Sequence, residues 1–156
     1  MKIEQATADD AVEILALQKL AYLSEAELYN DFTIPPLTQT LGEITAEFPR
    51  RVFLKAVEGG KIIGSVQGFE VGDTCQVGRL MVHPERQGEG IGTRLMAAIE
   101  AAFADVEQFE LFTGHKSVAN IRLYERLGYS VFRTEAVTPA LTLVFMEKRI
   151  HRGKTV

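Results

Sequence analysis

Cysteine and long apolar runs are scarce in this sequence, and each scarcity excludes a class of protein. The 156 residues include a single cysteine, Cys75, so no disulfide can form within the chain. A lone thiol suits a reducing compartment, and we expect a cytoplasmic protein. No apolar segment is long enough to cross a bilayer, and Met1–Gln5 lacks the apolar region of a signal peptide. We therefore expect no membrane partner.

Positive charge is also in short supply. Lysine and arginine total 17 against 21 for aspartate and glutamate, which leaves a net charge of −4 at pH 7. No basic field would draw the chain to nucleic acid, so we expect no nucleic-acid partner. The three histidines have no metal-ligand spacing, and we expect no metal. With 46% hydrophobic and 24% charged residues, the composition predicts one globular domain, residues 1–156.

Two common phosphate-binding motifs are absent from the sequence. A dinucleotide fingerprint fails in both registers, the first because Thr93 stands where a glycine is required. A P-loop is excluded although Gly153-Lys154-Thr155 occurs, because Lys148 occupies the position of the first P-loop glycine. Any phosphate site in this chain is therefore of another kind.

A glycine-rich junction is what the sequence does contain. Between Val82 and Met96, an apolar strand end is followed by Gly88, Gly90 and Gly92 and then by an amphipathic helix. Glycine lets the backbone approach a bulky ligand closely. The helix start adds unsatisfied N–H groups and a partial positive charge. The junction predicts an anion site suited to phosphates, and a glycine-rich turn without a ligand is the alternative interpretation.

Signals for strands and helices alternate along the chain. Capping boxes at residues 7–10 and 40–43 predict helix starts, and residues 58–60 predict a tight hairpin. We expect the prolines of Asp31–Pro36 to prevent helix continuation. The order indicates a mixed α/β domain. The predicted strands are 3–6, 52–57, 61–71, 74–82, 108–112, 130–133 and 141–146, and the predicted helices run through 11–21, 44–48, 91–103 and 118–127.

The glycine-rich junction resembles a motif of one enzyme superfamily. Gln87-Gly88-Glu89-Gly90-Ile91-Gly92 follows the pattern Q/R-x-x-G-x-G/A, which binds the coenzyme A pyrophosphate in the GNAT superfamily of N-acetyltransferases. The predicted elements are similar to the GNAT fold from end to end. The resemblance implies one GNAT acetyltransferase domain over 1–156, of the α/β (α+β mixed) class, with a mostly antiparallel central sheet flanked by helices. It also implies that the fourth and fifth strands, 74–82 and 108–112, splay apart around the acyl-carrying arm of coenzyme A.

A second motif, residues 120–129, resembles the GNAT pattern N-x-x-x-x-Y-x-x-x-G-F/Y, with one residue fewer between Asn120 and Tyr124. Residues four apart share a helix face, and we expect this face to look into the splayed cleft. Family roles imply that the Tyr124 hydroxyl protonates the departing coenzyme A thiolate and that Asn120 bonds the pantetheine arm. A tyrosine of pKa about 10 stays protonated at neutral pH, which suits an acid. In the alternative interpretation Tyr124 fills the core between Ile121 and Leu127.

The resemblance also implies a set of acetyl-CoA contacts. Backbone N–H groups of the glycine-rich junction would meet the pyrophosphate. The end of the fourth strand would pair with pantetheine, and one of its amides would face the thioester oxygen. Arg86 and Arg94 are placed either to meet the nucleotide phosphates or to form a solvated surface. The predicted catalytic residue is Tyr124, and the predicted cofactor-binding residues are Leu80, Met81, Val82, Gln87, Gly88, Glu89, Gly90, Ile91, Gly92, Thr93, Asn120 and Tyr124.

The implied activity is transfer of an acetyl group from acetyl-CoA to a primary amine of a small molecule or a peptide, directly, within a ternary complex. Segments 22–36 and 134–141 would wall the acceptor site. The first is rich in acidic and aromatic residues, which favour a cationic amine: Glu25, Glu27, Tyr29, Asp31 and Phe32. Family members are often dimers, so a homodimer stays open. A non-catalytic acyl-CoA-binding regulatory module is the alternative function.

The general base has no clear candidate in the sequence. Histone-acetylating GNAT members carry a glutamate on the fourth strand where this chain has Gln76, and an amide cannot accept the proton usefully. This difference leaves the regulatory alternative open. Four carboxylates are candidates for a more distant base, or else plain surface charges: Asp31, Glu70, Asp73 and Glu110.

Overall fold

The computed structural model describes residues 1–150, and Gly153-Lys154-Thr155 lies outside the described residues. Within this range the strands are β1 (Lys2–Gln5), β2 (Val52–Glu58), β3 (Lys61–Val71), β4 (Thr74–Val82), β5 (Gln108–Gly114), β6 (Ser130–Ala136) and β7 (Thr142–Arg149). The helices are α1 (Ala11–Ala21), α2 (Leu23–Tyr29), α3 (Pro35–Thr38), α4 (Leu41–Glu47), α5 (Ile91–Ala102) and α6 (Val118–Arg126), with 3₁₀ turns η1 (Ala8–Asp10) and η2 (Pro84–Arg86). None of the helices in residues 1–150 is long and apolar enough to cross a membrane.

Local sequence signals account for several of these elements. At α4 the Glu43 N–H donates to Thr40 Oγ1 at 3.2 Å, and the Thr40 N–H donates to Glu43 Oε1 at 2.9 Å, which is the predicted capping box. Gly59 and Gly60 both have positive φ, 59° and 77°, and form the predicted hairpin between β2 and β3. These predictions are confirmed.

The segment around the prolines is more helical than predicted. The preceding helix already ends at Tyr29, before the prolines, and Pro35 begins α3, because the first helical position needs no N–H donor. No helix was predicted at residues 23–29, where the structure has α2. This helix is followed by Asn30 in a left-handed conformation with φ 49°. The segment expected to be one wall of the acceptor site therefore contains two short helices.

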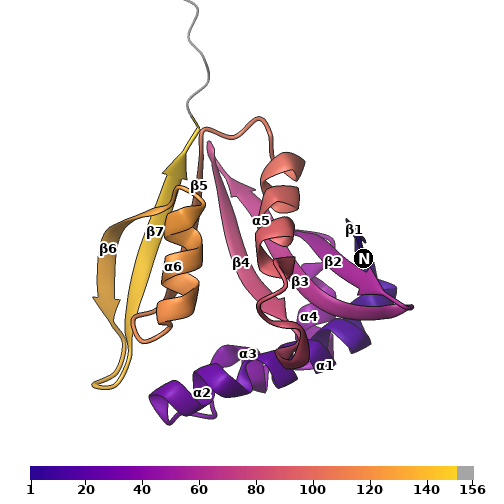
Figure 1. Ribbon diagram of the computed structural model, residues 1–156, viewed down its shortest axis with the longest axis horizontal. Coiled ribbons are helices and arrows are strands. Elements are labelled where there is room, and N and C mark those ends of the chain that lie inside the picture. Colours follow the sequence, from indigo (N-terminus) through magenta and orange to yellow (C-terminus); the bar gives the residue numbers. More distant parts are fainter. Residues whose placement is uncertain (151–156) are drawn as a thin grey trace, which may run out of the picture.

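The strands form one sheet in the order β1-β2-β3-β4-β5-β7-β6 within the described residues, with helices on both faces (Figure 1). All neighbouring pairs are antiparallel except β4 and β5, which are parallel. This confirms the predicted mixed fold class with a mostly antiparallel sheet. β3 is buried from Ile62 to Gly68, because both of its faces are covered.

Two apolar clusters hold the helices against the sheet. On one face, the predicted stripe of α5 is buried, with Ile91, Leu95 and Ile99 each at most 3% exposed. On the other face, Ile14 of α1 and Ile44 of α4 pack with Phe53, Ile62 and Met81. The end of β4 therefore lies between the two clusters and is fixed from both sides.

The predicted splaying of β4 and β5 is present. The two strands pair from Thr74 with Gln108 to Gln76 with Glu110. Beyond this point β4 stays with β3 as far as Val82, while β5 follows β7. Figure 1 shows the two strands meeting at one end and diverging toward the end where α2 lies. The sheet is thereby divided into two halves joined at one end.

Gly64 of β3 allows α5 to lie close to the sheet. A Cβ at this position would lie 2.9 Å from Leu95 Cδ1 and 3.1 Å from both Ile91 Cγ2 and the Met81 carbonyl oxygen. We predict that Gly64→Ala lowers the free energy of unfolding by about 1–3 kcal/mol, since a well-packed core resists an added methyl group. Urea unfolding followed by circular dichroism measures this value. Gly78→Ala is the control, because its Cβ would meet nothing within 4 Å. Equal effects of the two substitutions would contradict the prediction.

Candidate functional site

A β-bulge in β4 lies just beyond its last pair with β5. Gln67 pairs with Gly78 and Ser65 with Met81, so Arg79 and Leu80 together face Val66. Arg79 has φ 51°, a left-handed conformation that is uncommon outside glycine. A bulge bends its strand and increases the local twist. This bend directs the end of β4 away from β5.

The bulge also decides which backbone groups of β4 face the opening. The His83 N–H donates to the Ile63 carbonyl at 2.8 Å, and Met81 is the next residue of β4 that exchanges hydrogen bonds with β3. The peptide groups of Leu80 and Val82 therefore point into the space between β4 and β5. The backbone of Met81 points toward β3 instead, and its side chain is 3% exposed in the core.

The glycine-rich junction leads from β4 into α5 with unusual geometry. Gly88 and Gly90 have φ of 80° and 82°, and a Cβ at either would meet nothing within 4 Å. Gly90 is the N-cap of α5 and, having no side chain, provides no capping hydrogen bond, in contrast to Thr40 at α4. The first N–H groups of α5 are thus uncapped beside open space. This arrangement is suited to binding an anion.

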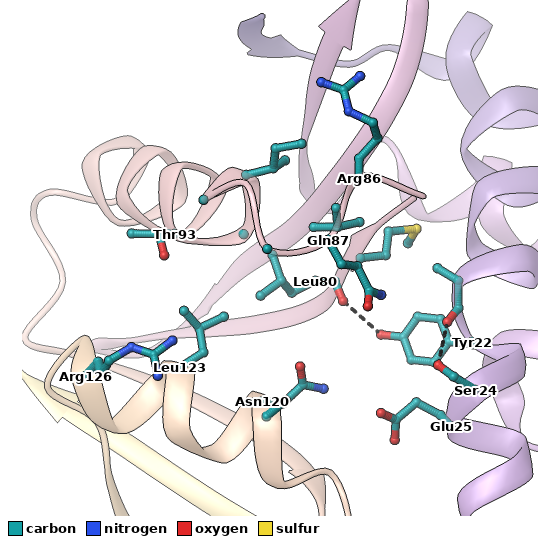
Figure 2. Close-up of a pocket in the computed structure, with 18 residues that line it drawn as sticks. Tyr22, Ser24, Glu25, Leu80, Arg86, Gln87, Thr93, Asn120, Leu123 and Arg126 are labelled. Carbon is teal, nitrogen blue, oxygen red and sulfur yellow. Dashed lines mark hydrogen bonds between the residues drawn. The ribbon is translucent and has the colours of Figure 1, made fainter. Parts of the chain in front are cut away.

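Arg86 is held by carboxylates. Its Nε lies 3.1 Å from both carboxylate oxygens of Glu89, and its Nη2 pairs with Glu58. These bonds raise the pKa of Arg86 and lower that of Glu89. The guanidinium points away from the cavity described below, so this side chain ties the junction to β2 (Figure 2). Arg94 is exposed and does not line that cavity.

A cavity of about 470 Å³ lies between the end of β4, the start of α5, α6 and α2. It brings together most of the predicted cofactor-binding residues, from three parts of the chain (Figure 2). Glu89 and Tyr124 are the two that do not line it. The lining residues are Ala21, Tyr22, Ser24, Glu25, Leu80, Met81, Val82, Arg86, Gln87, Gly88, Gly90, Ile91, Gly92, Thr93, Ala119, Asn120, Leu123 and Arg126.

The face of α6 toward the cavity differs from the predicted one. Asn120, Leu123 and Arg126 line the cavity at spacings of three residues. Tyr124 belongs to the neighbouring face, is 6% exposed and packs edge-on against Tyr129. The expectation that Asn120 and Tyr124 look into the cleft together therefore holds for Asn120 alone. Leu123 and Arg126 were not predicted as site residues. Their positions three and six residues after Asn120 were the sequence signal that could have placed them on the same helix face.

The Tyr124 hydroxyl nevertheless lies within electrostatic reach of the cavity wall. Burial raises its pKa above the usual value, and the charges of Tyr22 and Glu25 raise it further. Tyr22 donates a hydrogen bond to the Leu80 carbonyl at 3.4 Å, and burial raises its pKa to about 12. Both phenols are therefore protonated at neutral pH. Tyr22 was predicted only as the first residue of the acceptor-site segment 22–36, and no local motif marks it individually.

A side-chain link joins α2 to the start of α6. Ser117 Oγ donates to Glu25 Oε2 and lies 3.2 Å from Tyr29 Oη. Tyr29 Oη in turn accepts the Lys116 N–H at 3.0 Å. The ring fits there because Gly114 has no Cβ: one would lie 1.9 Å from Tyr29 Oη. This link holds the two halves of the sheet together at their diverging end.

The predicted base candidates lie outside the cavity. Glu110 accepts hydrogen bonds from Gln76 at 2.9 Å and Gln108 at 3.2 Å, where β4 and β5 last pair. Asp31 accepts hydrogen bonds from the Thr33 hydroxyl at 2.5 Å and the Thr33 N–H at 2.8 Å, and these bonds lower its pKa. Neither carboxylate lines the cavity, and nor do Glu70, Asp73 or residues 134–141. No group of three or more potential metal ligands occurs within residues 1–150.

Comparison with known proteins finds one family. The model of the Acetyltransferase (GNAT) family matches residues 17–129. The UPF0157 protein YqkA of Bacillus subtilis (strain 168) is 29% identical over 141 residues, which make up 90% of this chain and 40% of that protein. This chain thus spans 40% of the length of that curated relative.

Solved structures share the fold. The ribosomal-protein-S18-alanine N-acetyltransferase from Escherichia coli superimposes with a TM-score of 0.81 and 16% identity, over 98% of this chain and 96% of that one. An aminoglycoside 6'-N-acetyltransferase complexed with coenzyme A gives a TM-score of 0.75 and 19% identity, over 99% and 100% of the two chains. At these identities the likeness concerns the fold.

The link between α2 and α6 generates a test of stability. We predict that Tyr29→Phe lowers the free energy of unfolding by about 1–2 kcal/mol, because the Lys116 N–H loses its acceptor. Ser24→Ala on the same helix removes an exposed hydroxyl and should change this value by less than about 0.5 kcal/mol. Chemical denaturation of the three proteins measures both effects. An unchanged unfolding midpoint for Tyr29→Phe would mean that the link contributes nothing to stability.

Proposed function

This chain belongs to the acetyltransferase (GNAT) family, and from this premise we propose that it moves an acetyl group from acetyl-CoA to a primary amine of a small molecule or a peptide. Transfer is direct, within a ternary complex. We further propose that residues 1–156 form one acetyltransferase domain, which the single sheet through the described strands supports. The buried free thiol of Cys75 suits a reducing cytoplasm.

The uncapped start of α5 is the observation that carries this proposal. Gly88 and Gly90 leave room for a bulky anion beside N–H groups that no side chain satisfies. Arg126 adds a positive charge to the same cavity. We propose that the backbone of residues 87–93 binds the pyrophosphate of acetyl-CoA, with Arg126 beside it. Arg86 is excluded from this role by its two carboxylate partners.

The other proposed contacts follow the opening between β4 and β5. The peptide groups of Leu80 and Val82 suit the amides of the pantetheine arm, and one of their N–H groups would stabilise charge on the thioester oxygen. Asn120 would bond the same arm from α6. Acetyl-CoA supplies the activated acyl group. Tyr124 would protonate the departing sulfur, and its raised pKa keeps the proton available.

Two acceptor classes are compatible with the family. The structures that share this fold include one named for a ribosomal protein and one named for an aminoglycoside, a small molecule. We therefore keep both a peptide amine and a small-molecule amine in the proposal. The cavity wall formed by α2 and the β4 end would receive the acceptor, because it borders the position proposed for the thioester.

Binding of acetyl-CoA is the first prediction of this proposal. We expect wild-type protein to bind acetyl-CoA and free coenzyme A with dissociation constants in the micromolar range. This corresponds to a binding free energy of about −8 kcal/mol. Gly90→Glu should abolish binding, because it places bulk and negative charge at the proposed pyrophosphate position. Isothermal titration calorimetry measures both values.

The control for this substitution is Gly60→Glu. Gly60 also has a positive φ, 77°, and open space around it, but it lies in the β2–β3 hairpin. It therefore carries the same backbone strain and the same added charge away from the cavity. Absence of heat from folded wild-type protein would refute the acetyl-CoA proposal, and equal losses in both variants would refute the proposed pyrophosphate position.

Catalysis by Tyr124 is the second prediction. We expect Tyr124→Phe to lower kcat by about 10²-fold, since the departing thiolate loses its proton donor. The free energy of unfolding should change little, because no hydrogen bond to this hydroxyl occurs within residues 1–150. Release of coenzyme A thiol across a panel of primary amines measures kcat.

Tyr129→Phe is the matched control. The Tyr129 hydroxyl donates to Glu100 at 2.9 Å, outside the cavity, so its loss should lower stability and leave kcat within about twofold. An unchanged kcat for Tyr124→Phe would remove this residue from the mechanism. Binding of acetyl-CoA without thiol release for any amine would favour the acyl-CoA-binding regulatory module.

A further inference from the structure

The acidic residues of the segment between α1 and α3 differ in what they face. Glu27 is exposed on the outer side of α2. Asp31 uses its carboxylate to hold the turn at Thr33. Glu25 alone among these three lines the cavity. Figure 2 shows its carboxylate between Tyr22 and Asn120, directed toward the other residues that line the cavity.

Glu25 is held in this position by one of its two oxygens. Oε2 accepts the hydroxyl hydrogen bond of Ser117, a residue that is 4% exposed and precedes the first residue of α6. Ser117 is itself fixed by Tyr29. The other oxygen, Oε1, has no hydrogen-bond partner within residues 1–150. The carboxylate is therefore oriented by the protein and presents one acceptor atom to the cavity.

The surroundings of Glu25 relate it to the reacting groups. Glu25 and Tyr22 line the same cavity, and the Glu25 charge adds to burial in raising the pKa of both Tyr22 and Tyr124. The two phenols are uncharged at neutral pH and form no ion pair with the Glu25 carboxylate. Two cations line the cavity, and both lie outside α2: Arg126 belongs to α6, and Arg86 is paired with Glu58 and Glu89. Among the described residues no cationic side chain is paired with the Glu25 carboxylate, which lines the cavity beside the position proposed for the acceptor nitrogen.

We propose that Glu25 binds the acceptor as an ammonium ion through Oε1, and so selects amines that are positively charged at neutral pH. The bound nitrogen then loses one proton to solvent water, which frees its lone pair, before it attacks the thioester. This inference rests on the proposed function and names its substrate class: an alkylamine or a lysine-like side chain. A neutral arylamine would leave the carboxylate without its ion pair. An amino acid whose own carboxylate adjoins the amine would be repelled by Glu25.

The test measures binding of two probes, without turnover, to protein saturated with free coenzyme A. The probes are hexylamine, which is cationic at pH 7, and aniline, which is neutral, and both are titrated by NMR chemical-shift perturbation. Wild-type protein should bind hexylamine about 10- to 100-fold more tightly than Glu25→Gln does, as expected for loss of a charged hydrogen bond. Aniline binding should be the same for the two proteins within about twofold.

Glu27→Gln is the matched control, because it removes the same charge from the exposed side of the same helix. It should bind both probes as wild type does. Ser117→Ala gives a second variant that keeps the charge but releases Oε2, and it should weaken hexylamine binding while leaving aniline binding unchanged. Equal hexylamine affinity in wild type and Glu25→Gln would overturn the inference. So would an equal loss for both probes, which would indicate a structural role.

Thiol release by wild-type protein separates this inference from the proposed function. If hexylamine binds through Glu25 but no amine releases thiol, the ammonium site stands and the acetyltransferase activity fails. If thiol is released yet the loss of Glu25 changes neither hexylamine binding nor the preference for cationic amines, the activity stands and the ammonium site fails.

Discussion

The early end of the pairing between β4 and β5 is the constraint on which the site depends. Had the two strands paired along their whole length, β5 would satisfy the peptide groups of Leu80 and Val82, and no ligand could enter. The bulge at Arg79 bends β4 away at the point where pairing stops. Backbone groups left open in this way cost free energy unless something bonds them. Tyr22 does so for the Leu80 carbonyl, and the proposed pantetheine arm would do so for the rest.

An opening between strands must also be held at a constant width. At one end the paired start of β4 and β5 does this. At the other end the link from Glu25 through Ser117 to Tyr29 joins α2 to α6, and Gly114 makes room for the tyrosine ring. The same link orients the Glu25 carboxylate. Structural support and the proposed recognition of the acceptor therefore share a side chain, and the test on two probes of different charge separates the two roles.

Signals that act within a few residues were predicted correctly. The capping box of Thr40, the hairpin at Gly59 and the helix predicted over 118–127 each depend on local backbone geometry, and Gly128, which follows that helix, has φ 98°. The helix α2 was not predicted, because its short sequence has no strong start signal. The four-residue spacing predicted that Asn120 and Tyr124 both lie on the cavity side of α6. In the structure Asn120 does, but the residues that line the cavity after it are Leu123 and Arg126.

By itself the sequence determined the family, the order of the strands and of the four predicted helices, and the glycine-rich junction, since glycine spacing, caps and apolar periodicity act along the chain. It also pointed to the splayed strands, through the resemblance that the fold confirms. Only the tertiary structure decided which charged side chains face the cavity. Arg86 forms an ion pair with Glu58 of β2. Glu25 lines the cavity, whereas Glu27 and Asp31 do not. These outcomes depend on contacts between residues far apart in the chain, on which spacing in the sequence carries no information.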